Sequence, residues 1–332
     1  MSEPLLRISE LTVQFATRAG AIRANDHVSL DIRLGETLGI VGESGSGKSV
    51  LCRAILRLLP SPPAKVSAKA VMFGGRDLIR VDDKAMRAVR GRDISMIFQN
   101  PMTSLNPVWP IGDQVGEPLR VHRGMSGPQA RRSAIELLRR VGIPSPEKRI
   151  DDYPHQWSGG MMQRAMIAIA LAGAPKLMLA DEPTTALDVT IQDQILALLL
   201  ELQRESGMAL VLVSHDMGVI AETADRVAVM YAGRIVELAP TVAIFEAPAH
   251  PYTQGLLRSI PRLEERRADL AVIPGQPPDL ARLPKGCAFA ERCPLATAEC
   301  RSTAVALREN APGHVAACLY PERVSALSWS AA

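Results

Sequence analysis

Eight consecutive residues form the clearest candidate for chemistry in this chain. They match the pattern G-x-x-x-x-G-K-[ST], with an apolar run over residues 37–41 before them and a helical pattern after them. Glycines let the backbone curl so that successive N–H groups point at phosphate oxygens, and the following helix adds its positive end. Lys48 can then reach the β- and γ-phosphates, and Ser49 can ligate Mg²⁺. The loop consists of Gly42, Glu43, Ser44, Gly45, Ser46, Gly47, Lys48 and Ser49.

A pair of acids at the end of an apolar run is the second candidate. Residues 177–180 are apolar, and Asp181 and Glu182 follow them directly. Because burial disfavours an ionised carboxylate without a partner, a Mg²⁺ ion at the phosphate loop is a natural one. We expect Asp181 to hold the metal and Glu182 to polarise an attacking water as a general base. Without the loop, the same two acids would equally fit a strand that ends in solvent.

Strands and helices that could position these residues are readable from hydrophobic periodicity. The order strand, loop, helix, helical insert, strand, helix, strand predicts an α/β core around a parallel sheet. A helical subdomain is expected over about 102–172, and prolines after residue 248 predict a separate C-terminal appendage. Predicted strands cover 5–15, 27–41, 94–98, 177–180, 209–213 and a hairpin over 227–238; predicted helices cover 50–59, 130–141, 158–172 and 189–205.

Composition narrows the class of protein. The chain has 332 residues, of which 47% are apolar, so it can bury a full core. A net charge of +3 and 4% aromatic residues argue against a nucleic-acid surface, which needs clustered basic or stacking side chains. No apolar run approaches the roughly 20 residues that cross a bilayer, and the first 25 residues lack a signal-peptide core. We therefore expect a cytosolic protein that binds no nucleic acid.

Further motifs in a fixed order reveal a family resemblance. Trp157-Ser-Gly-Gly-Met161 resembles the signature motif of the ATP-binding cassette (ABC) family, and it precedes Asp181-Glu182 by about 20 residues, as in that family. Gln99 resembles the Q-loop glutamine, Ala186-Leu187-Asp188 the D-loop, and His215 the switch histidine. The resemblance implies the P-loop NTPase core of the ABC ATPase type, with an antiparallel β subdomain, an inserted helical subdomain and a small C-terminal appendage.

The resemblance also implies roles. Ser158, Gly159 and Gly160 would cap a helix whose positive end faces the ATP held by an opposing subunit. Gln99 would contact Mg²⁺ or the water, and His215 the γ-phosphate. Phe15 would stack on adenine. The residues alone leave other roles open. His215 could equally make a structural hydrogen bond at the end of a strand, and Phe15 could equally be a core residue. Gln99 taken alone would be expected at the surface.

The signature departs from the usual family form at three positions. Trp157 replaces leucine, Met161 replaces glutamine and Met162 replaces a basic residue. Phosphate binding is expected to survive, because the contacts come from the serine and the glycines.

Several segments resemble the oligopeptide/dipeptide importer branch of the family. They are Gln99–Pro107, Pro154–Gln156, His250–Thr253 and Pro284–Pro294. The resemblance implies a nucleotide-binding domain over 1–247 and a branch-specific region over 248–332. It implies a second ATPase subunit (identical or paralogous), two membrane permeases and, indirectly, an extracytoplasmic solute-binding protein. The chain would then sit peripherally at the cytoplasmic face of the inner (plasma) membrane.

Other functions stay open at this point. Related importers handle nickel, glutathione or another small solute. A soluble ABC ATPase acting on nucleic acid or ribosomes would usually carry coiled coils or tandem cassettes, which this chain lacks. A metabolic P-loop kinase gives no reason for Ser158-Gly-Gly160.

Four cysteines cluster in the last 46 residues, and a fifth, Cys52, stands alone. Their separations of five, six and 17 residues contain no C-x-x-C pair, so a zinc ribbon is a poor match. Four thiolates suit a [4Fe-4S] cluster, and the importer branch is similar in carrying an iron–sulfur site there. Zinc or unliganded thiols are the alternatives, and Cys52 is expected to be a core thiol. The clustered residues are Cys287, Cys293, Cys300 and Cys318.

Overall fold

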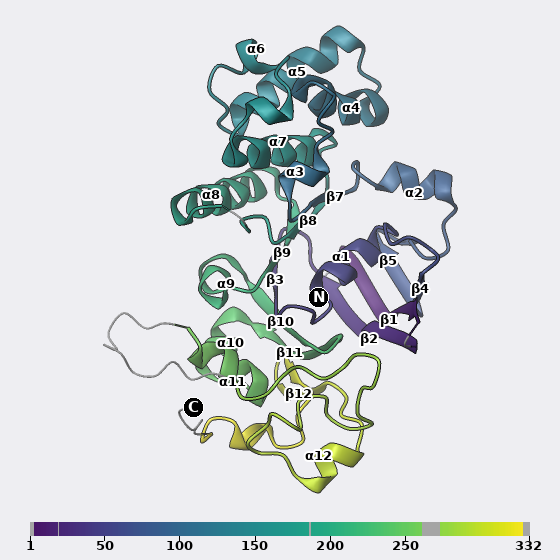
Figure 1. The fold of residues 1–332 in the computed structure, drawn as a ribbon, viewed down its shortest axis with the longest axis vertical. Coiled ribbons are helices and arrows are strands. Elements are labelled where there is room, and N and C mark those ends of the chain that lie inside the picture. Colours follow the sequence, from purple (N-terminus) through teal and green to yellow (C-terminus); the bar gives the residue numbers. More distant parts are fainter. Residues whose placement is uncertain (1–2, 19, 186, 261–272, 328–332) are drawn as a thin grey trace. The chain divides into compact units, whose positions relative to one another are not determined.

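The computed structural model describes residues 3–18, 20–185, 187–260 and 273–327 (Figure 1). The chain forms two compact units, one made of residues 1–32, 37–79 and 214–332, and one made of residues 33–36 and 80–213. The first unit contains the glycine-rich loop and the clustered cysteines. The second contains the two acids and the helical segment. Among the described residues, no helix combines the length and apolar character needed to cross a bilayer.

An antiparallel sheet opens the first unit and is drawn in purple and blue in Figure 1. Its strands run in the order β2-β1-β5-β6, and β4 also pairs with β1. In β1, Leu6 and Ile8 are buried while Arg7 between them is exposed, which is the alternation of a sheet with one face in the core. The strands are β1 (Leu6–Thr17), β2 (Gly20–Ile32), β4 (Ala64–Ser67), β5 (Ala70–Phe73) and β6 (Arg76–Asp77).

A second set of strands in this unit leads into the glycine-rich loop. Strand β3 (Thr37–Val41) is buried along its whole length and pairs in parallel with β10 (Arg226–Tyr231). On the other side of β10, the strands β11 (Arg234–Pro240), β13 (His314–Ala316) and β12 (Arg308–Ala311) follow in antiparallel pairs. The C-terminal residues thus extend the same set of strands.

Short helices complete the first unit. Helix α9 packs on β3, where Gly39 leaves room for Ile220. The helices are α1 (Lys48–Ile55), α9 (Met217–Thr223), α10 (Thr241–Glu246), α11 (Pro251–Arg258), α12 (Ala298–Ser302) and the 3₁₀ turn η2 (Pro321–Arg323).

The second unit combines three parallel strands with a group of helices. Strand β8 (Leu177–Asp181) is wholly buried and lies between β7 (Ile94–Ile97) and β9 (Ala209–Ser214). The predicted presence of a helical insert is confirmed, with α4, α5 and α7 packed on one another. The helices are α2 (Asp83–Val89), α3 (Pro101–Ser104), α4 (Ile111–Arg123), α5 (Gly127–Arg140), α6 (Pro146–Arg149), η1 (Pro154–Gln156), α7 (Gly159–Ala172) and α8 (Val189–Ser206).

The single strand predicted over 27–41 is instead divided into β2 and β3, and two further predicted boundaries differ from the structure for local reasons. Helix α1 ends at Ile55 rather than near residue 59, because Arg57 adopts a left-handed conformation with φ of 51°. The N–H of Leu58 donates to the carbonyl of Arg53 at 2.9 Å and that of Arg57 to Ala54 at 3.0 Å, a Schellman cap. Strand β2 begins at Gly20 rather than residue 27, because its polar first half pairs with the end of β1.

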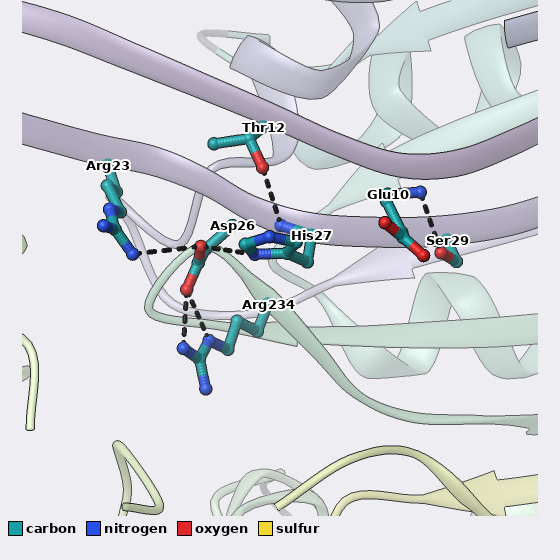
Figure 2. Close-up of polar contacts among 7 residues, drawn as sticks. All are labelled: Glu10, Thr12, Arg23, Asp26, His27, Ser29 and Arg234. Carbon is teal, nitrogen blue, oxygen red and sulfur yellow. Dashed lines mark hydrogen bonds and ion pairs between the residues drawn. The ribbon is translucent and has the colours of Figure 1, made fainter. Parts of the chain in front are cut away.

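A buried carboxylate joins β2 to β11 (Figure 2). Nε and Nη2 of Arg234 donate to Oδ2 of Asp26, at 2.8 and 2.6 Å, and His27 and Arg23 contact Oδ1. Burial alone raises the pKa of Asp26, but the hydrogen bonds and charges of Arg234 and His27 outweigh it, so the pKa lies below its ordinary 3.8. Asp26 therefore stabilises the fold as an anion.

We expect Asp26→Asn to lower the free energy of unfolding by about 2 kcal/mol at pH 7, because it removes a charged, buried hydrogen-bond acceptor. Since folding lowers the pKa of Asp26, this stabilisation is present above the ordinary pKa of 3.8 and is lost as the pH falls through the folded-state value. Thermal melts of both proteins between pH 7 and pH 3 should show the difference in Tm narrowing with acid.

Asp151→Asn is the matched control. Asp151 pairs with Arg131 at 2.6 Å, but both side chains are exposed, so the change in Tm should be small at every pH. A difference between wild type and Asp26→Asn that stays constant with pH would contradict the assignment.

Candidate active site

The glycine-rich loop turns sharply between β3 and α1. Gly42, Gly45 and Gly47 have φ of 151°, 79° and 101°. A Cβ atom on Gly42 would lie 2.1 Å from the carbonyl oxygen of Met230, and one on Gly47 would lie 2.3 Å from that of Ala24. The backbone path therefore requires glycine for its dihedral angles and for the space it leaves.

Lys48 begins α1 and is buried within the loop. Its ammonium nitrogen donates to the carbonyl oxygens of Gly42 at 2.7 Å and Glu43 at 3.0 Å. Ser49 follows it in the first turn of the helix. The predicted phosphate-binding residues thus lie together on one strand–loop–helix segment, the context that the motif requires.

Neighbouring segments hold the C-terminal half of the loop. The side-chain amide of Asn25 donates to the carbonyl of Gly47 at 3.1 Å, and the N–H of Gly233 donates to that of Ser46 at 3.0 Å. Asp26 follows Asn25 and accepts from Arg234, which follows Gly233. The network around Asp26 therefore fixes the two segments that touch this half of the loop.

In the second unit, the two acids lie where β8 ends. Asp181 is completely buried, and Glu182 has a left-handed φ of 48°, an uncommon conformation for a residue other than glycine. The side-chain amide of Gln99 donates to Glu182 Oε2 at 2.9 Å, so the structure brings these two predicted residues together.

Thr185 is a residue that the sequence did not single out. Its hydroxyl donates to the same Glu182 oxygen at 3.0 Å, and its N–H donates to the Glu182 carbonyl at 3.2 Å. The only available signal was its position three residues after Glu182, which suits a turn. Glu182 is thus held from the Gln99 side and from the turn that follows it.

The signature segment begins a buried helix. Ser158 caps α7, its hydroxyl accepting from the N–H of Met161 at 3.3 Å, and the first turn contains no acid. Ser158 and Gly159 are exposed and Gly160 is half-buried. The capped end of α7 therefore offers backbone N–H groups at the surface of its unit.

The three residues that depart from the usual signature are buried or half-buried. Trp157 is buried, and its indole N–H donates to Asp152 at 3.1 Å. Met162 is buried as well, and Met161 is half-buried. Trp157 and Met162 serve the packing of the unit, and Ser158 caps α7 as predicted.

The predicted switch histidine, adenine-stacking residue and D-loop fall in separate segments of the chain. His215 is exposed directly after β9, beside Asp216, which caps α9. Phe15 is half-buried near the end of β1, opposite Ile22 and Ala64. Of the predicted D-loop, Ala186 lies outside the described residues, and Asp188 caps α8 by accepting from Ile191 at 2.9 Å.

The four clustered cysteines line one small apolar cavity of about 20 Å³ together with Phe289 and Tyr320. All four are free thiols, and the N–H of Cys287 donates to the carbonyl of Cys300 at 2.8 Å. Burial raises the pKa of Cys293 to about 12 and that of Cys318 to about 11. Within the described part of the chain, no three His, Cys, Asp or Glu side chains are arranged to hold a metal ion. Cys52 is buried on α1, as expected for a core thiol.

Comparisons with known proteins agree with this arrangement. Residues 25–185 match the family described as ABC transporter, and residues 236–300 match the oligopeptide/dipeptide transporter C-terminal region. A putative peptide import ATP-binding protein of Brucella melitensis is 51% identical, over 98% of this chain and 99% of that protein. The dipeptide transport ATP-binding protein DppD of Escherichia coli is 50% identical, over 96% of this chain and 97% of that protein.

A solved structure supports the same conclusion. The dimeric, post-hydrolysis structure of the ATP-binding cassette MJ0796 bound to ADP and Pi is similar with a TM-score of 0.64 and 30% identity. The matched region covers 71% of this chain and 98% of the MJ0796 chain. The chain therefore belongs to the ATPases of the ABC transporter family, in the branch that carries the oligopeptide/dipeptide transporter C-terminal region.

Proposed function

We propose that this chain is the ATPase subunit of an ABC importer for dipeptides or oligopeptides. It would bind Mg-ATP and couple hydrolysis to two membrane permeases that receive peptide from an extracytoplasmic solute-binding protein. The observation that carries the proposal is the carboxylate of Glu182, held by Gln99 and Thr185 directly after the buried Asp181. The near full-length likeness to peptide import ATPases supports the peptide as cargo.

The reaction is attack of water on the γ-phosphate, which releases ADP and phosphate. Glu182 orients the water and accepts its proton, and Gln99 holds that carboxylate in place. Lys48 and the N–H groups of the loop balance the charge that develops on the phosphate oxygens, and His215 donates a hydrogen bond to the γ-phosphate. Phe15 stacks on the adenine ring.

The donor atoms available for a metal suit Mg²⁺. The hydroxyl of Ser49, the carboxylate of Asp181 and the side-chain carbonyl of Gln99 all offer oxygen, which this hard cation prefers. When bound, the ion held by these residues would neutralise charge on the phosphate oxygens.

A second ATPase subunit, identical or paralogous, completes the site. The exposed end of α7 at Ser158, Gly159 and Gly160 would bind the γ-phosphate of the ATP held by that subunit. Each nucleotide is then enclosed between two chains.

Exposed apolar side chains in the second unit suit contact with a permease. Met102 and Val108 are 72% and 73% exposed, and Trp109 is 46% exposed, all within eight residues of one another. Large apolar side chains grouped at a surface commonly mark a protein interface. Such a contact would keep the chain at the cytoplasmic face of the inner (plasma) membrane.

The four cysteines of the tail are proposed to hold a [4Fe-4S] cluster. Support comes from their common cavity and their free thiols. Because the cavity has room for about one water molecule, a cluster would have to widen it. Four sulfur ligands suit iron–sulfur or zinc better than harder metals.

We expect Glu182→Gln to retain Mg-ATP binding while phosphate release falls by about 10²–10⁴-fold, the usual effect of losing a general base. The variant should form a stable dimer with Mg-ATP on a sizing column. Glu201→Gln, an exposed change on α8, is the control and should turn over normally. Wild-type turnover in Glu182→Gln would remove this residue from the reaction.

Affinity purification from membranes tests the importer assignment. Two permeases are expected to co-purify with the tagged chain, and Val108→Asp should reduce their yield several-fold, because a charge cannot be buried there without a partner. Val242→Asp introduces the same charge at an exposed valine of the first unit and should have no effect. Recovery of nucleic acid in place of permeases would contradict the proposal.

Protein prepared without oxygen should be brown and contain about four irons per chain, the content of the proposed cluster. Cys293→Ser should lose the colour and the iron, whereas Cys52→Ala should keep both. Colourless protein with bound zinc would favour a zinc site, and metal-free protein with unaltered stability would leave the thiols unliganded.

A further inference from the structure

Arg292, in the C-terminal region, forms an ion pair with Glu43 of the phosphate loop. The Arg292 guanidinium forms two hydrogen bonds with the Glu43 carboxylate, from Nη1 to Oε2 at 2.8 Å and from Nη2 to Oε1 at 3.0 Å. The Arg292 side chain is only 6% exposed. A bidentate pair of this kind, here with a buried guanidinium and a half-buried carboxylate, belongs to the strongest and most directional side-chain contacts.

Arg292 is itself fixed from several directions. Its Nε donates to the carbonyl of Pro274 at 2.9 Å, and its terminal nitrogens also reach the Tyr231 hydroxyl at 3.3 Å and the Ile273 carbonyl at 3.4 Å. Burial alone lowers the pKa of Arg292, but the hydrogen bonds to Glu43 and Tyr231 outweigh it and raise the pKa. The guanidinium is therefore a charged group whose orientation is set by several hydrogen bonds.

A tyrosine of α11 holds the backbone of the same loop residue. The N–H of Glu43 donates to the Tyr252 hydroxyl at 2.8 Å. Tyr252 is completely buried, with its ring 4.6 Å from that of Tyr231 and 5.4 Å from that of Phe289. Aromatic packing thus sets the position of the Tyr252 hydroxyl, which accepts the hydrogen bond from the loop.

All polar groups of Glu43 are occupied in this way. Its side chain contacts Arg292, its N–H contacts Tyr252, and its carbonyl accepts from Lys48 at 3.0 Å. Asn25 and Gly233 hold the other half of the loop. Residues of the C-terminal region therefore supply the contacts at the start of the loop, where the backbone turns away from β3.

We propose that Arg292 and Tyr252 are positioning residues for nucleotide binding, which act through Glu43 to keep the phosphate loop and Lys48 ready for the triphosphate. The inference rests on the proposed binding of Mg-ATP by this loop. Neither residue would contact the reacting atoms. The effect should thus appear in the affinity for nucleotide and in KM, with little change in kcat.

Arg292→Gln and Tyr252→Phe test the proposal in the full chain. Both should raise the Kd for Mg-ATP, measured by calorimetry in the Glu182→Gln background, by about tenfold, which corresponds to about 1.4 kcal/mol. In the otherwise wild-type chain, KM for ATP should rise by a similar factor while kcat stays within about twofold. Arg292→Lys keeps the charge but cannot form the two parallel hydrogen bonds to Glu43. Its Kd and KM should lie between those of the wild type and those of Arg292→Gln. Arg323→Gln, at an exposed tail residue, is the control.

A double-mutant cycle separates positioning from a general loss of structure. If Arg292 acts through Glu43, then Arg292→Gln combined with Glu43→Gln should weaken Mg-ATP binding no more than the stronger single change. Additive losses in the cycle, or wild-type Kd and KM in both Arg292→Gln and Tyr252→Phe, would overturn the inference. Tyr252→Phe removes one oxygen only, so it keeps the test open should Arg292→Gln not fold.

Different results would contradict the proposed function and the inference about Arg292 and Tyr252. Wild-type protein that binds no Mg-ATP, or whose binding is unaffected by Lys48→Ala, contradicts the proposed function together with this inference. Binding that depends on Lys48 but not on Arg292 or Tyr252 contradicts the inference alone.

Discussion

The phosphate-binding loop depends on a backbone path that only glycine can follow. At Gly42 and Gly47 the carbonyls of Met230 and Ala24 lie where a side chain would begin. Such close approach is possible only because the strands β2 and β10 are held firmly against the loop, by pairing with their neighbours and by the carboxylate of Asp26. The apolar strands of this unit therefore determine the shape of a polar site.

Glu182 is under a comparable constraint. It occupies a left-handed conformation that costs free energy, and it stays there because β9 and the following turn hold its backbone at both ends. The N–H of Glu182 donates to the carbonyl of Val213 at 3.2 Å, and its carbonyl accepts from Thr185. In this backbone conformation the carboxylate lies within hydrogen-bond distance of Gln99, which is 83 residues earlier in the chain.

Much of this could be predicted from the sequence, because the motifs are local and the strands are apolar. The phosphate loop, the acids at the end of β8 and the helical insert follow from patterns within a few residues. Contacts between distant segments could not be predicted. Nothing in the sequence near Arg292 indicates a partner 249 residues away, and Tyr252 carries no sign of its bond to the loop. Likewise, the early end of α1 depends on one backbone angle at Arg57, which composition does not reveal.

The carboxylate of Glu237 has a consequence for exchanging C-terminal segments between related proteins. It is wholly buried in β11 and accepts hydrogen bonds from the N–H groups of Ala249 and His250, while His314 lies 2.7 Å from it. A chimera joined near residue 247 would leave this buried carboxyl group without hydrogen-bond partners unless the incoming segment brought equivalent donors. Grafting between cassettes is therefore limited by one buried acid whose hydrogen-bond donors lie in the segment that would be exchanged.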